Sequence, residues 1–288
     1  MTTTKKIDLA TVWSQRELTT DIYDLWIQSD IAKDAKPGQF LCIYPKNPST
    51  LLPRPISICE IDAAASKLRI VYRVVGSGTR EFSSYSQGET IRILGPLGNG
   101  FPNPQGNPHT HDSESRFISI SESHEYAIPQ MSLNANPNPR ILLVGGGIGI
   151  PPLLEVAKRY ANTQAVLGYR DANLFLMDEF AAYTQTYAAT QDGSAHTKGT
   201  VIDAIQENNL QTELIFACGP MPMLRAIKEY AASKQIQAYL SLEERMACGI
   251  GACLGCVART KQCDPHTHVH NARICTEGPV FAAEGVDI

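Results

Sequence analysis

Four cysteines near the end of the chain have the residue type and the spacing that could hold an iron–sulfur cluster. Cys248, Cys253 and Cys256 reproduce the C-x4-C-x2-C spacing of plant-type [2Fe–2S] sites, in which a fourth cysteine comes from further along the chain. Glycines lie between these ligands, where the backbone must turn sharply and bring its N–H groups close to sulfur. The stretch predicts a cluster to which the rest of the chain would deliver electrons.

The fourth ligand can be chosen between two cysteines. Cys263 lies in a polar turn, where its thiol should face water. Cys275 follows a short strand-like stretch and precedes Glu277-Gly-Pro, a turn that can bring sulfur back to the loop. We therefore predict that Cys275 is the fourth ligand.

Two other metal interpretations stay open. Four thiolates can also hold a structural zinc ion, but zinc ribbons usually carry two C-x2-C pairs, and only Cys253 and Cys256 have that spacing here. The alternating His266, His268 and His270 could form a weak metal-binding tract, for which a solvated or strand-like hairpin is the simpler explanation.

Length and composition set the broad class. A chain of 288 residues indicates about two domains. With a net charge of -4, the chain lacks the excess of basic residues that nucleic-acid-binding proteins carry.

The sequence predicts neither secretion nor a membrane span. The N-terminus lacks the apolar segment of a secretory signal, and the richest apolar run, residues 141–154, is too short and too broken by glycine and proline to span a membrane. We expect a cytoplasmic protein, which the buried-type thiols of Cys42, Cys59 and Cys218 fit.

Residues 1–102 predict a small antiparallel β-barrel. Short alternating or β-branched runs follow one another and are separated by turn residues such as Pro37-Gly38 and Gln87-Gly88. The clearest runs are residues 25–27, 39–44, 56–61, 68–75 and 90–94. The only helix expected among them is a short one over residues 79–85.

Two stretches of this barrel could bind a flavin nucleotide. Around Arg54 two prolines fix the backbone, so that a cation and the Ser57 hydroxyl project from one rigid strand entry. The strand through Tyr72 ends in glycines, and a helix beginning near Thr79 would offer free N–H groups to a pyrophosphate. A proline-bounded edge strand and an ordinary hairpin turn explain each stretch taken alone, whereas the cluster loop makes flavin binding the better account.

Residues 103–139 read as a linker or insert. They are rich in proline, asparagine, serine and glycine and have one strand-like island, residues 117–120. His109, His111 and His124 invite a metal interpretation, but a solvated loop explains them better.

Residues 140–242 predict an α/β domain with a parallel sheet. A buried strand, a glycine turn containing Gly145, Gly147 and Gly149, and an amphipathic helix come first. Ile150 stands where the last glycine of G-x-G-x-x-G should be, so the standard Rossmann fingerprint is absent. The N–H groups of the turn could still hold a dinucleotide pyrophosphate.

Further strand–helix units follow, and in a parallel sheet ligands bind at the carboxyl ends of the strands. The expected strands are residues 165–170, 187–192, 214–219 and 237–242, with helices at 201–207 and 221–232. The loops at 168–170, 192–194 and 218–220 would line the site. Arg170 could pair with the 2′-phosphate of NADPH, whereas Asp171 could accept from a ribose hydroxyl; we favour NADH.

The motif at residues 54–57, the turn at 76–79 and the stretch at 94–101 resemble the FAD domain of the ferredoxin reductase superfamily. The resemblance implies FAD contacts at Arg54, Pro55, Ile56, Ser57, Val71, Tyr72, Arg73, Gly78 and Thr79. This superfamily uses the variant glycine turn, which implies dinucleotide contacts at Gly145, Gly146, Gly147, Gly149, Cys218, Gly219 and Pro220. Cys218 would then serve in packing and positioning near the nicotinamide rather than as a nucleophile.

The order of the modules narrows the resemblance. An FAD barrel, a dinucleotide-binding domain and a C-terminal [2Fe–2S] domain at residues 243–288, with residues 246–256 and 275–281, resemble the electron-transfer subunits of class 1B dihydroorotate dehydrogenase. The resemblance implies electron transfer between NAD(H), FAD and the cluster, an FMN-containing catalytic subunit as partner in a heterotetramer, and a role in pyrimidine (UMP) biosynthesis. The insert at 103–139 departs from the family.

Two other functions remain as alternatives. One is a reductase subunit of the same build that serves a ferredoxin:NADP reductase or hydrogenase complex. The other is a non-catalytic scaffold with zinc in the cysteines. Among the residues no general acid or base stands out, and hydride donation to flavin needs none, so the oxidation of dihydroorotate would occur on the partner.

Overall fold

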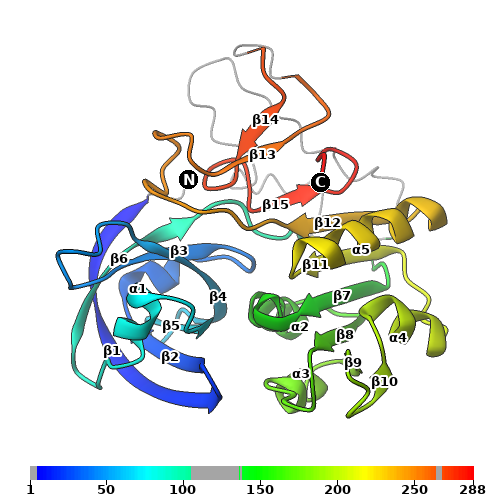
Figure 1. Ribbon diagram of the computed structural model, residues 1–288, viewed down its shortest axis with the longest axis horizontal. Coiled ribbons are helices and arrows are strands. Elements are labelled where there is room, and N and C mark those ends of the chain that lie inside the picture. Colours follow the sequence, from blue (N-terminus) through cyan, green and yellow to red (C-terminus); the bar gives the residue numbers. More distant parts are fainter. Residues whose placement is uncertain (1–4, 105–135, 137, 264–267) are drawn as a thin grey trace.

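The computed structural model describes residues 5–104, 136, 138–263 and 268–288. Figure 1 shows a β-barrel, drawn in blue and cyan, beside an α/β unit drawn in green and yellow. The C-terminal segment, in orange and red, lies along one side of both. The three-part architecture predicted from the sequence is confirmed. None of the described helices is long and apolar enough to cross a membrane.

The barrel consists, within the described residues, of strands in the order β1-β2-β5-β4-β3-β6, and it is closed. Its strands are β1 (Lys6–Thr19), β2 (Ile22–Gln28), β3 (Phe40–Tyr44), β4 (Arg54–Asp62), β5 (Lys67–Arg73) and β6 (Thr90–Leu97). All neighbours are antiparallel. The strand β1 was not expected from the sequence, and it closes the barrel because it pairs with both β2 and β6.

Two short helices accompany the barrel strands. The 3-10 helix η1 (Asp30–Lys33) follows β2, and α1 (Ser77–Phe82) follows β5. The helix α1 therefore begins two residues before the expected start at Thr79 and ends earlier than expected. Phe82 anchors it in the barrel core, where its ring packs edge-on against Tyr72.

The α/β unit is built, among the described residues, on a sheet of order β10-β9-β8-β7-β11-β12-β15. Its own strands are parallel and comprise β7 (Ile141–Gly146), β8 (Thr163–Tyr169), β9 (Gln185–Thr190), β10 (Thr197–Lys198), β11 (Leu214–Cys218) and β12 (Gln237–Ser241). The helical elements are η2 (Gly147–Gly149), η3 (Pro151–Leu153), α2 (Leu154–Arg159), α3 (Met177–Ala181), α4 (Val201–Glu207) and α5 (Met221–Lys234). The predicted α4 and α5 are confirmed, whereas α3 was not expected.

The C-terminal segment starts and ends beside the α/β unit. It contains β13 (Val257–Arg259) and β14 (Asn271–Arg273), which pair with each other, and β15 (Val280–Ala282), which pairs antiparallel with β12. Residues 280–282 thus belong to the edge of the parallel sheet although they lie beyond the boundary predicted at residue 243. The exact domain boundaries stay a prediction.

An aromatic cluster joins the barrel to the sheet. Phe216 of β11 is fully buried, and its ring centroid lies 5.0 Å from that of Phe101, which follows the last barrel strand. Tyr160 and Tyr239 approach the same ring edge-on. Because these rings come from segments far apart in sequence, the cluster ties the two units together.

Truncation of the central ring should destabilise the whole chain. We expect Phe216→Ala to lower the free energy of unfolding by about 3–5 kcal/mol, since it removes a fully buried aromatic side chain and leaves a cavity. Urea denaturation followed by fluorescence measures the change. The smaller truncation Phe216→Leu should lose less stability, because it leaves a smaller cavity, and equal losses for both variants would contradict the packing role.

Candidate electron-transfer site

The predicted FAD strand and the predicted phosphate turn meet at Arg54. Its Nη1 donates to the Leu52 carbonyl oxygen at 2.6 Å, which holds the guanidinium at the start of β4. A Cβ added to Gly78 would lie 2.8 Å from Arg54 Nε. The start of α1 therefore lies directly against the guanidinium, an arrangement in which a cation and a helix start could bind a phosphate group together.

Thr79 shapes the turn before α1. Its hydroxyl oxygen accepts hydrogen bonds from the backbone N–H groups of Val75 (2.9 Å) and Gly76 (3.2 Å), and the side chain is buried. Open space surrounds Gly76, because a Cβ there would meet no atom within 4 Å. The threonine thus keeps the glycine turn in a shape that leaves its backbone accessible.

The predicted residues of β5 divide between the two faces of the strand. Val71 points outward and packs in the apolar cluster between barrel and sheet, and the exposed Arg73 lies on the same face. Tyr72 points inward, where it is 1% exposed and its hydroxyl donates to Gln15 Oε1 at 3.0 Å. Only the backbone of Tyr72 is therefore available to a flavin.

The same alternation orders the residues of β4. Ile56 packs against the barrel core. Pro55 pairs with Cys42 of β3, and Ser57 pairs with Phe40; both barrel partners belong to the apolar cluster outside the barrel. Pro55 and Ser57 therefore share the outer face of the barrel with Cys42.

The two predicted dinucleotide turns lie against each other. A Cβ on Gly149 would lie 2.4 Å from the Cys218 carbonyl oxygen, and one on Gly146 would lie 3.0 Å from Pro220 Cδ. Gly219 in turn approaches Gly146 so closely that its Cβ would lie 3.0 Å from the Gly146 nitrogen. These glycines are required by the close approach of the two backbones.

The departure from the Rossmann fingerprint has a packing reason. Ile150 is fully buried, and its Cγ1 would lie 2.9 Å from a Cβ on Gly145. The isoleucine therefore fills the space where the fingerprint glycine would allow closer helix–strand packing. Gly147 has a φ of +53°, and a Cβ there would meet no atom within 4 Å, so no described side chain or backbone segment packs against it on that side.

Cys218 is fully surrounded by protein. The thiol is 1% exposed, and burial raises its pKa well above the ordinary value. A protonated, buried thiol is a poor nucleophile. The geometry agrees with a packing role for Cys218 at the end of β11.

The loop after β8 does not settle the cofactor preference. Asp171 uses one carboxylate oxygen within its own turn, where it accepts from the Asn173 backbone N–H at 2.9 Å and from the side-chain amide at 2.6 Å. Arg170 is exposed. The choice of NADH stays a prediction.

The four candidate cluster cysteines lie in two pairs. The thiol of Cys248 interacts with that of Cys253, and the thiol of Cys256 interacts with that of Cys275. Within the described ranges, no three histidine, cysteine or carboxylate side chains gather around one point as ligands of a single ion would. A two-iron cluster takes two thiolates on each iron, so two pairs suit it.

The backbone of the cluster loop favours a thiolate at Cys248. Burial opposes the charge, but the backbone N–H groups of Ile250, Cys253 and Ala252 and the side chain of Cys253 together outweigh it and lower the pKa of the Cys248 thiol to about 6. The Ile250 N–H lies 3.5 Å from the sulfur. Backbone N–H groups directed at sulfur are the environment that the glycine-rich spacing predicted.

A hairpin brings Cys275 to the loop. The Ile274 N–H donates to the Cys256 carbonyl oxygen at 2.8 Å, which extends the β13–β14 pairing to the cysteines. Arg273 Nη1 donates to the Gly251 carbonyl oxygen at 3.1 Å and its guanidinium also pairs with Glu277. Cys263 lies exposed beyond the other end of β13. The structure thus brings Cys275, rather than Cys263, beside Cys256.

One residue of this site was missed in the sequence. Cys42 of β3 is fully buried, and its sulfur would lie 3.0 Å from a Cβ on Gly249, which has a φ of +68°. The cluster loop thus rests on the barrel strand next to Pro55 of the predicted FAD strand. A buried cysteine in an apolar strand carries no signal of a distant contact, so the sequence alone could not reveal it.

Several predicted features lie outside the described residues. They are the strand-like island at 117–120 and His109, His111, His124 and His266. Of the histidine tract, His268 and His270 are described and exposed, and His270 Nδ1 lies 3.2 Å from the Lys261 carbonyl oxygen.

Comparison with known proteins agrees with this geometry. The sequence pattern of the iron–sulfur cluster binding domain of dihydroorotate dehydrogenase B matches residues 243–287. The electron transfer subunit of dihydroorotate dehydrogenase B (NAD(+)) from Bacillus velezensis is 39% identical over 283 residues, which cover 96% of this chain and 97% of that protein. The Geobacillus kaustophilus subunit is 38% identical and covers 95% of each chain.

Two solved reductase structures share the fold of this chain. The structure of an NADH-dependent reduced ferredoxin-NADP oxidoreductase aligns with a TM-score of 0.75 and 28% identity over 97% of this chain and 90% of its own. A ferredoxin NADP+ reductase from Neisseria gonorrhoeae, with a TM-score of 0.57 at 16% identity over 79% of this chain and 91% of its own, shares the fold. Given the identity to the Bacillus and Geobacillus subunits over nearly the whole length, this chain belongs to the family of dihydroorotate dehydrogenase B electron transfer subunits.

Proposed function

We propose that this chain carries electrons between NAD(H) and an FMN-containing dihydroorotate dehydrogenase subunit, through FAD and a [2Fe–2S] cluster. The observation that carries the proposal is the contact of Gly249 with Cys42, because it sets the cluster loop against the strand beside the predicted FAD strand. Close approach of the two dinucleotide turns at Gly149 and Cys218 supports the nicotinamide end of the same path.

The bound FAD would convert the two-electron hydride of NADH into the single electrons that an iron–sulfur cluster accepts. The protein's part is to bind and orient. Arg54 with the turn at Gly78 and Thr79 would hold the FAD phosphates, while Pro55 and Ser57 face the side on which the cluster loop lies. The other proposed FAD contacts are Ile56, Val71, Tyr72 and Arg73, with the inward Ile56 and Tyr72 contributing backbone atoms.

The proposed dinucleotide site lies at the carboxyl ends of β7 and β11. Gly145, Gly146, Gly147 and Gly149 would accept the pyrophosphate on backbone N–H groups, and Cys218, Gly219 and Pro220 would lie near the nicotinamide. The buried, neutral Cys218 gives no nucleophile here, and hydride donation needs none. The proton removal that dihydroorotate oxidation needs would therefore occur on the partner subunit. Both subunits would work in the cytoplasm.

We assign the cluster to Cys248, Cys253, Cys256 and Cys275. The pairing of their thiols supports the assignment, and the match of residues 243–287 to an iron–sulfur binding domain favours iron over the zinc alternative. The hairpin contact between Ile274 and Cys256 supports Cys275 as the fourth ligand.

Replacement of the two candidate fourth ligands should separate them. We expect Cys275→Ser to lose the cluster, whereas the matched variant Cys263→Ser keeps it, because only Cys275 lies beside Cys256. Iron and sulfide content, together with visible absorbance of anaerobically purified protein, measures the outcome. The reverse result would move the ligand to Cys263, and zinc in place of iron in the unmodified chain would refute the cluster itself.

The face around the cluster loop is the proposed partner surface. Ile250 and Leu254 are 50% and 63% exposed on the loop itself. The apolar area extends onto the barrel, since the 68% exposed Ile7 of β1 pairs with Leu94, whose side chain lies beneath Gly249. Exposed apolar side chains next to a redox centre suit a protein partner that must approach the cluster closely.

A charge on this surface should weaken the assembly. We expect Ile7→Glu to reduce affinity for the FMN-containing subunit by at least about tenfold, because a carboxylate would be buried unpaired. Surface plasmon resonance with the partner measures it, and the matched Ile7→Val should bind normally. Unchanged binding of Ile7→Glu, with FAD and iron intact, would exclude β1 from the interface.

The proposed function is tested by anaerobic NADH oxidation with orotate as acceptor. Turnover should require both this chain and the FMN-containing subunit from the same host. If NADH bleaches the flavin but orotate is not reduced, the chain is a reductase that serves another acceptor. The likeness to a ferredoxin-NADP oxidoreductase favours that alternative. A flavin that NADH does not reduce would refute the proposal.

A further inference from the structure

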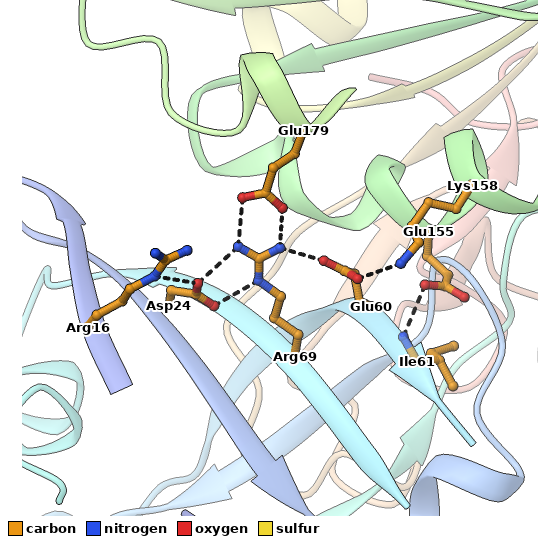
Figure 2. A network of polar contacts seen from close by, with 8 residues as sticks. All are labelled: Arg16, Asp24, Glu60, Ile61, Arg69, Glu155, Lys158 and Glu179. Atoms are coloured by element: carbon orange, nitrogen blue, oxygen red, sulfur yellow. Dashed lines mark hydrogen bonds and ion pairs between the residues drawn. The ribbon is translucent and has the colours of Figure 1, made fainter. Parts of the chain in front are cut away.

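A buried arginine joins the barrel to the α/β unit. Arg69 of β5 is 3% exposed, yet carboxylates from three elements surround its guanidinium. Asp24 of β2 and Glu60 of β4 belong to the barrel, whereas Glu179 comes from α3 of the α/β unit. Figure 2 shows the guanidinium at the centre of this set.

Every N–H of this guanidinium has an acceptor. Nε and Nη2 donate to the two oxygens of Asp24 at 2.8 and 2.9 Å. Nη2 also donates to Glu179 Oε1 at 3.0 Å, and Nη1 donates to Glu179 Oε2 and to Glu60 Oε2. An arginine has five such hydrogens, so all five are used. A group this completely paired and this deeply buried has one orientation.

Neighbouring charges complete the set, which we name the Arg69 network. Lys158 of α2 pairs with Glu60 at 2.5 Å, and Arg16 pairs with Asp24 at 3.2 Å. Three cations, Arg16, Arg69 and Lys158, therefore balance three carboxylates. Beside the network, Glu155 of α2 accepts from the Ile61 backbone N–H at 3.0 Å, which is a further contact across the interface.

The elements that meet in the network also carry the proposed cofactor sites. Strand β4 begins with Arg54 at the FAD corner and reaches the network at Glu60. Helix α2 follows the dinucleotide turn and reaches the network at Lys158. The two elements are short and directly packed, so a shift at the network moves one cofactor segment relative to the other.

We propose that the Arg69 network is a positioning device for hydride transfer, which holds the dinucleotide turn at the correct distance from the FAD strand. Glu179 and Lys158 are positioning residues that act through the domain interface and touch no cofactor. The inference rests on the proposed transfer from NADH to FAD. A misplacement of about 1 Å can cost a reaction about a hundredfold in rate, so this interface is well placed to control it.

The test is Glu179→Gln, which removes the carboxylate that α3 contributes to the Arg69 network and leaves Arg69 paired with Asp24 and Glu60. In anaerobic stopped-flow experiments, we expect the limiting rate of flavin bleaching by NADH to fall at least about tenfold. The dissociation constant for NADH should change less than threefold, because the dinucleotide turn itself is intact. FAD content, iron content and reduction by dithionite should match the unmodified chain.

The matched control is Asp178→Asn, which removes a carboxylate from the same helix at an exposed position. It should keep the full rate. Lys158→Met, which breaks the Glu60 link from α2 but leaves Glu179 on Arg69, should lower the limiting rate in the same direction, and it decides the question if Glu179→Gln does not fold.

A normal limiting rate in folded, FAD-loaded Glu179→Gln or Lys158→Met would overturn the proposal, even if the variant melts earlier. Equal losses in Asp178→Asn would overturn it as well, because they would reflect helix α3 in general. Failure of NADH to bleach the unmodified chain would instead refute the proposed function.

Discussion

One continuous apolar core holds the three parts of this chain in place. It contains Cys42, Leu94 and Leu97 from the barrel, strands β7, β11 and β12 from the sheet, and Met246, Cys256 and Ile274 from the C-terminal segment. Complete burial of each large apolar side chain contributes roughly 1.5–3 kcal/mol. Since the three proposed cofactor regions border this core, the distances between them depend on how it packs.

At the interface between the barrel and the α/β unit, apolar packing provides stability, whereas the Arg69 network restricts the geometry. Hydrophobic contact is non-directional and stabilises many similar arrangements. A buried, fully paired guanidinium adds little net stability, because desolvation offsets the attraction of the charges, but it tolerates few geometries. The core thus brings the units together, and the network together with the glycine contacts at Gly149 and Gly249 selects one arrangement.

Local patterns in the sequence were enough for much of the fold. The parallel strands, the glycine turns and helix α4 follow from hydrophobic period and turn chemistry, and α4 has a capping box formed by Thr200 and Asp203. Strand β1 escaped prediction because its polar residues interrupt the alternation, among them Gln15, whose side chain satisfies two carbonyl groups near α1. Helix α3 has five residues and starts after Leu176 in a left-handed conformation, without a capping signal.

Local sequence patterns could not predict the contacts between segments that are far apart in sequence. Arg69 and Asp24 occupy positions that read as the solvated face of alternating strands, and nothing local shows that α3 covers them. The contact between Cys42 and Gly249 likewise joins segments that share no local signal. For the cluster, in contrast, cysteine spacing contains most of the information, because the four proposed ligands lie within one loop and one hairpin.

The return of the chain through β15 has a consequence for how the C-terminal segment can be treated. Its backbone completes the hydrogen bonding of β12, and Leu242 donates to the Pro279 carbonyl oxygen at 2.8 Å. Removing the segment would leave a bare sheet edge on the dinucleotide unit, and transplanting it would leave β15 without a neighbour. The iron–sulfur segment therefore cannot be exchanged between family members by itself. A chimaera has to exchange it together with the sheet whose edge it completes.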